Sequence, residues 1–176
     1  MTWALVVVDM QGKLQQDNSA LARQVGAKVD RLIEAFESAG EAIYRVENAL
    51  DARPLLPGST RQTLYRYGTD AFTGSGLSSR LRSDGVNCIV LCGAGTDTVI
   101  DTTAKRALAS GFDVLLVSDA HLAHARGDLS AETIVTYHNA LLADWVTPGQ
   151  IIEVLPAEDI LAILSESPML PAAVGW

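Results

Sequence analysis

The side chains best suited to chemistry follow the apolar runs of the chain. Asp9 comes directly after the apolar run at residues 4–8, and Arg66 lies in a short segment at residues 63–67. A carboxylate can transfer protons, and a guanidinium can hold a carboxylate through two parallel hydrogen bonds. These two residues therefore predict a site for acid–base chemistry or for binding an anionic molecule.

Both residues also have a plainer interpretation. An acid that ends an apolar strand is either functional or a structural carboxylate that caps a loop or pairs with Arg66. A strand end in a cleft favours function for Asp9, because carboxyl groups in such places have shifted pKa values. Arg66 is either an electrostatic clamp or a solvated arginine, since many surface ion pairs contribute little.

A glycine-rich turn, Gly93-Ala94-Gly95-Thr96, precedes a predicted helix over residues 97–110. Peptide dipoles at the start of a helix attract anionic or polarised groups. The turn lacks the third glycine of a dinucleotide-binding fingerprint, so it predicts a tight turn instead.

The elements that must position these residues alternate along the chain. Apolar runs predict strands at 4–10, 42–46, 63–67, 88–92, 113–117 and 151–155, and helical spacing predicts helices at 20–39, 77–83, 97–110, 130–142 and 156–164. This alternation predicts an α/β fold, a three-layer α/β/α sandwich with a six-stranded, mostly parallel sheet. Ligands of such sheets bind at the carboxyl ends of the strands. We expect one domain over residues 1–176.

Composition excludes several classes of protein. The chain has 176 residues, 48% of them hydrophobic, which suits one domain with a substantial core. Its net charge of −8 argues against a nucleic-acid binder, which needs a basic face. No apolar run reaches the roughly 20 residues that cross a bilayer, and no basic signal-peptide region opens the chain. We expect a cytoplasmic protein that binds neither nucleic acid nor membrane.

The cysteines and histidines predict neither a disulfide nor a metal site. Cys88 and Cys92 lie about 13 Å apart on one predicted strand, too far for a disulfide. Burial raises the pKa of a thiol, so Cys92 is a poor candidate nucleophile. Asp119, His121 and His124 make only a weak set of metal ligands. We expect no metal and no cofactor.

Two irregular segments keep alternative interpretations. The loop at residues 48–61 brings Arg53 and Arg61 either to an anionic substrate or simply to solvent. The apolar tail at residues 168–176 is either a frayed end or a segment that packs on another subunit.

Four motifs together resemble the isochorismatase-like cysteine hydrolases. They are VVVDMQ at 6–11, DAFTGSGL at 70–77, GAGTDTVIDTTAKRALASGFDVLLVSDA at 93–120 and HNAL at 138–141. Their order and spacing cover nearly the whole chain. The resemblance implies the six-stranded α/β/α fold, a homo-oligomer and an unusual cis peptide in the turn at residues 93–95. It also implies hydrolysis of small amides, N-carbamoyl compounds or the vinyl ether of isochorismate.

The resemblance implies an Asp–Lys–Cys triad, because the amidases of this family use one. The family's Asp falls on Asp9, its Lys on Arg66 and its Cys on Val99. Valine has no nucleophilic atom, so a covalent route through position 99 is impossible. Isochorismatases also lack the cysteine and use the Asp as an acid, but the segment GAGTDTVID is more similar to the amidases.

Two functional hypotheses follow from this pattern. The first is a hydrolase that acts on a small polar or anionic molecule without the family cysteine, with Asp9 as acid or base and Arg66 as clamp. The second is a pseudoenzyme that binds a ligand or forms oligomers. An engineered variant of a family enzyme is less favoured, because two separate positions differ. In either case we expect the ligand to contact Gln11, Tyr67, Phe72, Ala94, Gly95 and Thr98.

Overall fold

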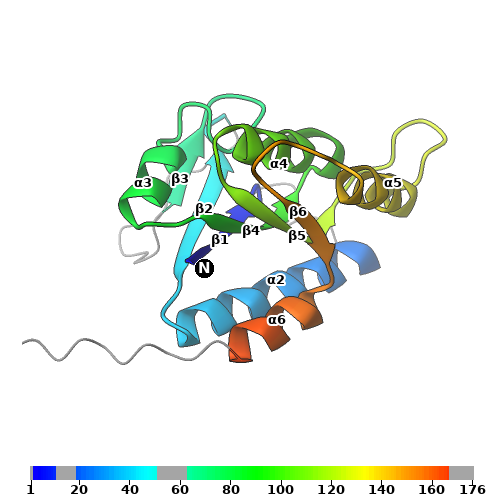
Figure 1. Ribbon diagram of the computed structural model, residues 1–176. Coiled ribbons are helices and arrows are strands. Elements are labelled where there is room, and N and C mark those ends of the chain that lie inside the picture. The colour runs from blue at the N-terminus through cyan, green and yellow to red at the C-terminus, as the bar shows by residue number, and fades with distance from the viewer. Residues whose placement is uncertain (1, 11–18, 51–62, 167–176) are drawn as a thin grey trace, which may run out of the picture.

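The computed structural model describes residues 2–10, 19–50 and 63–166, and within them strands and helices alternate (Figure 1). The strands are β1 (Trp3–Val8), β2 (Ala42–Asn48), β3 (Thr63–Arg66), β4 (Cys88–Ala94), β5 (Asp113–Leu122) and β6 (Ile152–Leu155). The helices are α2 (Ala20–Ser38), α3 (Leu77–Ser83), α4 (Asp101–Ala109), α5 (Ala131–Ala143) and α6 (Ala157–Glu166), and a π-helical turn, η1 (Thr96–Ile100), precedes α4. In this part of the chain, no helix has the length and apolar character to span a membrane.

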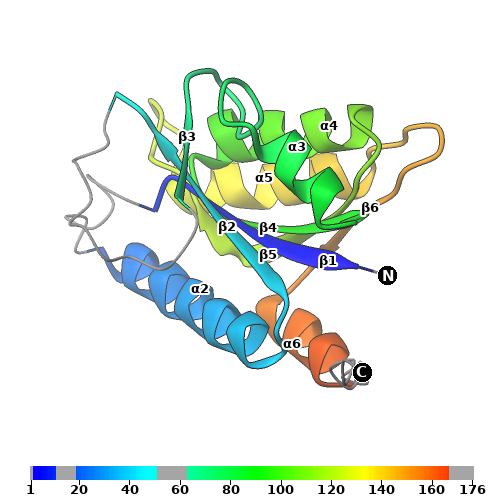
Figure 2. The same cartoon turned by 90° about the vertical axis from the view of Figure 1, so that its left-hand side faces the viewer.

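The six strands form one parallel sheet in the order β3-β2-β1-β4-β5-β6. Helices α2 and α6 cover one face, and α3, α4 and α5 cover the other (Figure 2). Each face has its own cluster of buried apolar side chains. The predicted α/β/α sandwich with a six-stranded parallel sheet is therefore confirmed.

Local sequence explains where the longest helix begins and ends. The Ser19 side chain accepts a hydrogen bond from the Ala22 amide at 3.1 Å, which caps the start of α2. Val25, Val29 and Phe36 recur at helical spacing and face the sheet. The predicted stop at Gly40 is confirmed.

Three features differ from the sequence expectations. The helix predicted from residue 97 opens as the π-helical turn η1, and the strand predicted to end at residue 117 continues to Leu122. The cis peptide implied by the resemblance is also wrong, because the described residues contain none. Gly93 (φ 128°) and Gly95 (φ 80°) turn the chain through positive φ angles instead, which glycine adopts without steric cost.

Some predicted residues lie outside the described ranges. They are Gln11, the loop arginines Arg53 and Arg61, and the tail at residues 168–176.

Candidate functional site

The strand order reverses its direction between β1 and β4. From β1 the chain continues through β2 to β3 on one side, and β4, β5 and β6 lie on the other. Ligands of open parallel sheets bind where the strand order reverses in this way. Asp9 follows β1, and the Gly93–Gly95 turn ends β4, so both lie at this point.

Asp9 has an unusual backbone conformation. It is the non-glycine residue with a positive φ, 50°, in the described part of the chain, and its amide donates to the Val46 carbonyl at 2.9 Å. Aspartate tolerates this left-handed region better than most residues, but the conformation still costs free energy. Residues held in this way cluster at functional sites, which favours a functional role for Asp9.

Arg66 holds the Asp9 carboxylate from the end of β3. Its Nε donates to Oδ1 and Oδ2 of Asp9 at 3.1 and 3.2 Å, and its Nη2 also donates to Oδ2. Its Nη1 donates to the Gly68 carbonyl. The side chains of Arg66 and Asp9 are only 8% and 17% exposed. The expected contact between the two residues is therefore present, as a fork-like ion pair that excludes most of the solvent.

A second carboxylate is close enough to be affected by the charge of Asp9, and sequence reasoning missed it. Burial raises the pKa of Glu47 at the end of β2, the nearby Asp9 charge adds to the rise, and Arg45 opposes it. The strand-end position of Glu47 was the available signal. Two neighbouring carboxyl groups in different surroundings can divide the roles of proton acceptor and proton donor.

Gly93 allows β4 to approach β1 closely. A Cβ atom on Gly93 would lie 2.0 Å from the Val8 carbonyl oxygen and 2.7 Å from the Val8 amide nitrogen. These are backbone atoms and cannot move aside cheaply, so a glycine is required here. The turn continues at Gly95, whose amide donates to the Leu122 carbonyl at 2.8 Å.

The η1 turn carries the position at which the resemblance predicts a nucleophile. Val99 is 7% exposed and packs in the core on the α3–α5 side. Thr98 is exposed, and its hydroxyl donates to the Gly95 carbonyl at 3.2 Å. Ala94 is buried at the end of β4. Position 99 therefore holds an apolar side chain that is largely buried.

Neither cysteine replaces a nucleophile at position 99. Cys88 and Cys92 are free thiols buried on the α2–α6 side of the sheet, as the sequence predicts. Burial raises the pKa of each thiol to about 12. A thiol with this pKa is protonated at neutral pH and a poor nucleophile.

The aromatic residues expected to contact a ligand lie in different surroundings. Tyr67 follows β3 and is 75% exposed, so it is open to a ligand. Phe72 is buried, and its ring stacks on Phe112 with the centroids 6.0 Å apart. Because Phe112 precedes the amino end of β5, the Phe72 ring packs in the core and does not join the group at the strand ends. A ligand contact at Phe72 stays a prediction.

Two of the three residues weighed as metal ligands have other partners. Asp119 accepts hydrogen bonds from Lys28 Nζ at 2.5 Å and from the Ala157 amide at 2.9 Å. His121 contacts the Thr96 hydroxyl and the Asn139 side chain, both at 2.9 Å. Among the described residues, no three such side chains form a group that could hold a metal ion.

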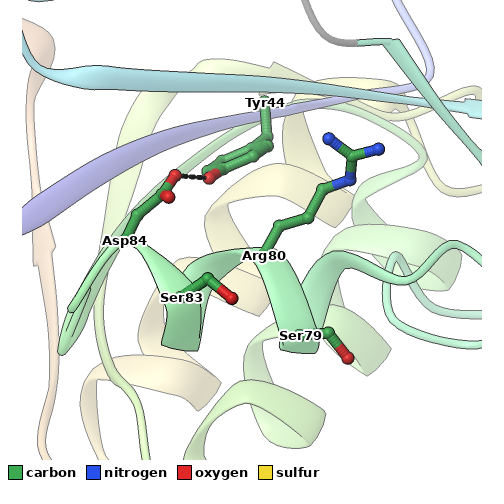
Figure 3. A pocket seen from close by; sticks show the side chains of 5 residues that line it. All are labelled: Tyr44, Ser79, Arg80, Ser83 and Asp84. Atoms are coloured by element: carbon green, nitrogen blue, oxygen red, sulfur yellow. Dashed lines mark hydrogen bonds between the residues drawn. The ribbon is translucent and has the colours of Figure 1, made fainter.

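A shallow polar pocket of about 260 Å³ lies elsewhere, between β2 and α3. It is lined by Tyr44, Ser79, Arg80, Ser83 and Asp84, and Figure 3 shows the Tyr44 hydroxyl pointing at the Asp84 carboxylate. Burial and this hydrogen bond raise the pKa of Tyr44. None of the site residues predicted from the sequence lines the pocket, so it is separate from the residues gathered at the strand ends.

Comparisons with known proteins agree with this geometry. Residues 50–142 match the family model described as the isochorismatase domain. The uncharacterized isochorismatase family protein YecD of Escherichia coli O157:H7 is 40% identical over 68% of the chain and 79% of that protein. A streptothricin hydrolase of Streptomyces noursei is 27% identical over 96% of the chain and 67% of that protein. The crystal structure of a cysteine hydrolase from Pseudomonas syringae pv. phaseolicola 1448A has a TM-score of 0.75 at 17% identity, over 93% of the chain and 92% of that structure.

Proposed function

We propose a function from one premise: the chain belongs to the isochorismatase family. The proposed function is hydrolysis of a small polar or anionic molecule by a route that does not use a cysteine. The observation that carries it is Asp9, a strained carboxylate at the reversal point of the sheet that Arg66 holds in place. Its location supports a ligand site, and its charge supports proton transfer.

The state of Asp9 favours the role of base over the role of acid. A carboxylate that receives N–H groups from a guanidinium is an anion in that contact, so it holds no proton to donate when the reaction begins. In the proposed step, Asp9 takes a proton from a water molecule while the water oxygen bonds to the carbonyl carbon of an amide or carbamoyl substrate. Asp9 then returns the proton to the leaving nitrogen as the carbon–nitrogen bond breaks. In the net reaction, one water molecule is consumed for each carbon–nitrogen bond that is cleaved.

Arg66 supports the preference for a polar or anionic substrate. A guanidinium has five N–H groups, and the contacts to Asp9 and Gly68 engage three of them. The other two are suited to a carboxylate or carbonyl oxygen of the ligand. Arg66 would then act as a clamp between the ligand and Asp9.

The relatives support a hydrolase and leave the substrate open. The Streptomyces noursei relative is named a hydrolase, and the Pseudomonas syringae structure is named a cysteine hydrolase. If Val99 occupies the position of the family nucleophile, this chain lacks the covalent intermediate of a cysteine hydrolase. A direct attack by water, with Asp9 as the base, is then the proposed route.

The test is turnover by the purified chain with a panel of small amides, N-carbamoyl compounds and isochorismate. Asp9→Asn keeps the size and the backbone preference of Asp9 but removes its charge, and we expect it to lower kcat at least about 100-fold. Asp84→Asn, in the separate pocket, is the matched control and keeps full turnover. No turnover of any panel member by the wild-type protein would contradict the proposal.

A second candidate function is ligand binding without catalysis. Two observations favour it: Val99 has no reactive atom, and Asp9 and Arg66 are already engaged with each other. A binding protein would give a calorimetric binding signal with a panel compound and no product. Asp9→Asn would then retain the fold and much of the affinity, whereas in a hydrolase it abolishes turnover.

The predictions of a homo-oligomer and of a cytoplasmic location remain predictions. Light scattering coupled to gel filtration measures the mass in solution directly, and fractionation of the source cells locates the protein.

A further inference from the structure

Strand β5 contains extra residues opposite the end of β4. Leu91 of β4 pairs with Leu116 of β5, but Gly93, two residues later, pairs with His121, five residues later. β5 therefore has three more residues than β4 in this stretch. Such bulges re-aim side chains and are common beside active sites. The bulge brings His121 to the carboxyl edge of the sheet, in the same row as Gly93 and Val8.

Contacts from three helices hold the bulge. The Asp119 carboxylate accepts from Lys28 Nζ of α2 at 2.5 Å and from the Ala157 amide of α6 at 2.9 Å. The Ser118 carbonyl accepts from Asn139 Nδ2 of α5 at 2.9 Å. With anchors on both faces of the sheet, the bulge is a defined part of the fold.

The hydrogen bonds of His121 fit a neutral imidazole that carries its hydrogen on Nε2. Asn139 uses its Nδ2 to donate to the Ser118 carbonyl, so its Oδ1 is the acceptor that faces His121 Nε2 at 2.9 Å. Nε2 therefore carries the hydrogen. His121 Nδ1 is then free to accept from the Thr96 hydroxyl, also at 2.9 Å. This is one neutral tautomer with both ring nitrogens satisfied.

Thr96 links this network to the candidate site. It is fully buried, and it is the first residue of η1, the turn that carries Val99. The preceding residue, Gly95, has no side chain that could cap the turn, and its carbonyl accepts from the Thr98 and Ile100 amides at 3.1 and 3.0 Å. The hydroxyl of Thr96 is therefore the side-chain anchor at the start of η1.

We propose that neutral His121 is a positioning residue that fixes the start of η1, at the carboxyl end of β4, by accepting the hydrogen of the Thr96 hydroxyl. The proposal rests on the proposed function, because it assumes that η1 lines the site of the reaction. His121 touches neither Asp9 nor a substrate, so it acts through the backbone from Ala94 to Val99. This chain builds the contact from residues of β5, η1 and α5, which are far apart in sequence.

The surroundings of His121 keep the imidazole neutral. Burial lowers its pKa, and the nearby His138 of α5 lowers it further. The hydrogen bond to Asn139 and the charge of Asp119 oppose this shift, and burial is the largest of the four effects. Protonation would place a hydrogen on Nδ1 and leave the Thr96 hydroxyl hydrogen without its buried acceptor, which is costly.

Paired variants test the anchor without reference to turnover. Thr96→Val removes the hydroxyl but keeps the shape, and Thr96→Ser keeps the hydroxyl. His121→Asn places an oxygen near the position of Nδ1, whereas His121→Gln extends toward Asn139 instead. The measurement is hydrogen exchange of the Thr98 and Ile100 amides by NMR, with the Leu32 amide of α2 as an internal reference for global stability.

We expect Thr96→Val to speed amide exchange at Thr98 and Ile100 about tenfold relative to Leu32, because the variant loses one hydrogen bond. Thr96→Ser should restore the wild-type rate, and His121→Asn should lie closer to wild type than His121→Gln. After correction for the chemistry of exchange, protection of these amides in the wild type should fall as the pH is lowered, and in Thr96→Val this dependence should disappear. Equal exchange in the valine and serine variants would overturn the proposal.

Kinetics separate this proposal from the function on which it rests. With a substrate in hand, Thr96→Val should lower kcat and leave KM unchanged, because a displaced η1 affects the reacting geometry. Turnover by the wild type with unaltered exchange and kcat in Thr96→Val would overturn the role of His121 and leave the hydrolase. Altered exchange in a wild type that turns over no compound would overturn the hydrolase and leave the anchoring of η1.

Discussion

Two polar groups lie at the same edge of the sheet and differ in almost every physical respect. On the β3 side, Asp9 and Arg66 form a charged pair that keeps some solvent contact and includes a strained backbone residue. On the β5 side, Thr96, His121 and Asn139 form a neutral chain around a histidine that is 1% exposed. Gly93 separates the two groups.

The difference indicates how one edge can serve both chemistry and architecture. A buried neutral network with satisfied hydrogen bonds specifies one geometry and tolerates little change. A partly exposed charged pair can exchange its partner for a ligand or transfer a proton. The first group is therefore suited to hold the turn, and the second to meet the substrate.

The largest effect is expected from adding a side chain at Gly93, the residue that lies between the two groups. Gly93→Ala would place a methyl group 2.0 Å from the Val8 carbonyl at a φ of 128°. We expect it to lower the free energy of unfolding by at least about 4 kcal/mol in urea denaturation.

Gly111→Ala is the matched control for this substitution. Gly111 also has a positive φ, 87°, but its added Cβ would meet nothing within 4 Å. Gly111→Ala should therefore lower the free energy of unfolding by only about 1 kcal/mol, which is the penalty of the backbone conformation. Equal costs at the two glycines would show that β1 and β4 do not approach as closely as described.

The next effect concerns the charged group alone. Arg66→Met would leave the largely buried Asp9 carboxylate without its cation, and we expect a loss of about 3 kcal/mol in the free energy of unfolding. Asp9→Asn in the Arg66→Met background should recover much of this loss, since no unpaired charge remains. Additive losses in this double-mutant cycle would contradict the ion pair.

A smaller effect concerns the neutral group and depends on pH. Because the pKa of His121 is lowered in the folded state, the unfolded chain binds more protons as the pH falls through about 6.5. The neutral His121 side chain therefore makes its full contribution to the free energy of unfolding above that pH. This contribution is lost as the pH falls toward the folded-state pKa of His121. Urea denaturation at several pH values should show that acidification lowers the free energy of unfolding less in His121→Asn than in the wild type. Parallel pH dependences of the two proteins would contradict a buried neutral histidine.

The smallest effect is expected at the thiols, which belong to neither group. Cys88 and Cys92 should not react with a disulfide reagent until the protein unfolds, because they are buried and their pKa values are raised to about 12. Cys92→Ala should cost about 1 kcal/mol of stability and no turnover. Loss of turnover in this variant would contradict a route without cysteine.

The fold and the charged group were predictable from sequence because both depend on simple patterns. Buried parallel strands appear as continuous apolar runs, and the residues after them must meet at one edge. For this reason Asp9 and Arg66 could be paired although 57 positions separate them. Cys88 and Cys92 could be placed in the core for the same reason.

The neutral group was not predictable because it depends on an irregularity of one strand. Three extra residues in β5 change which side chains face η1, and the apolar pattern around His121 gives no sign of them. The positive φ of Asp9 and the π-helical start at Thr96 are likewise consequences of tertiary packing. The stacking of the buried Phe72 ring on Phe112 is a further consequence of tertiary packing that its motif does not reveal.

The two outermost strands of the sheet, β3 and β6, are only four residues long. A strand at the border of a sheet exposes unpaired amide and carbonyl groups that can recruit another chain, and short borders limit this hazard. We therefore expect the folded protein to resist amyloid-like stacking, and any association between copies to proceed through helix surfaces.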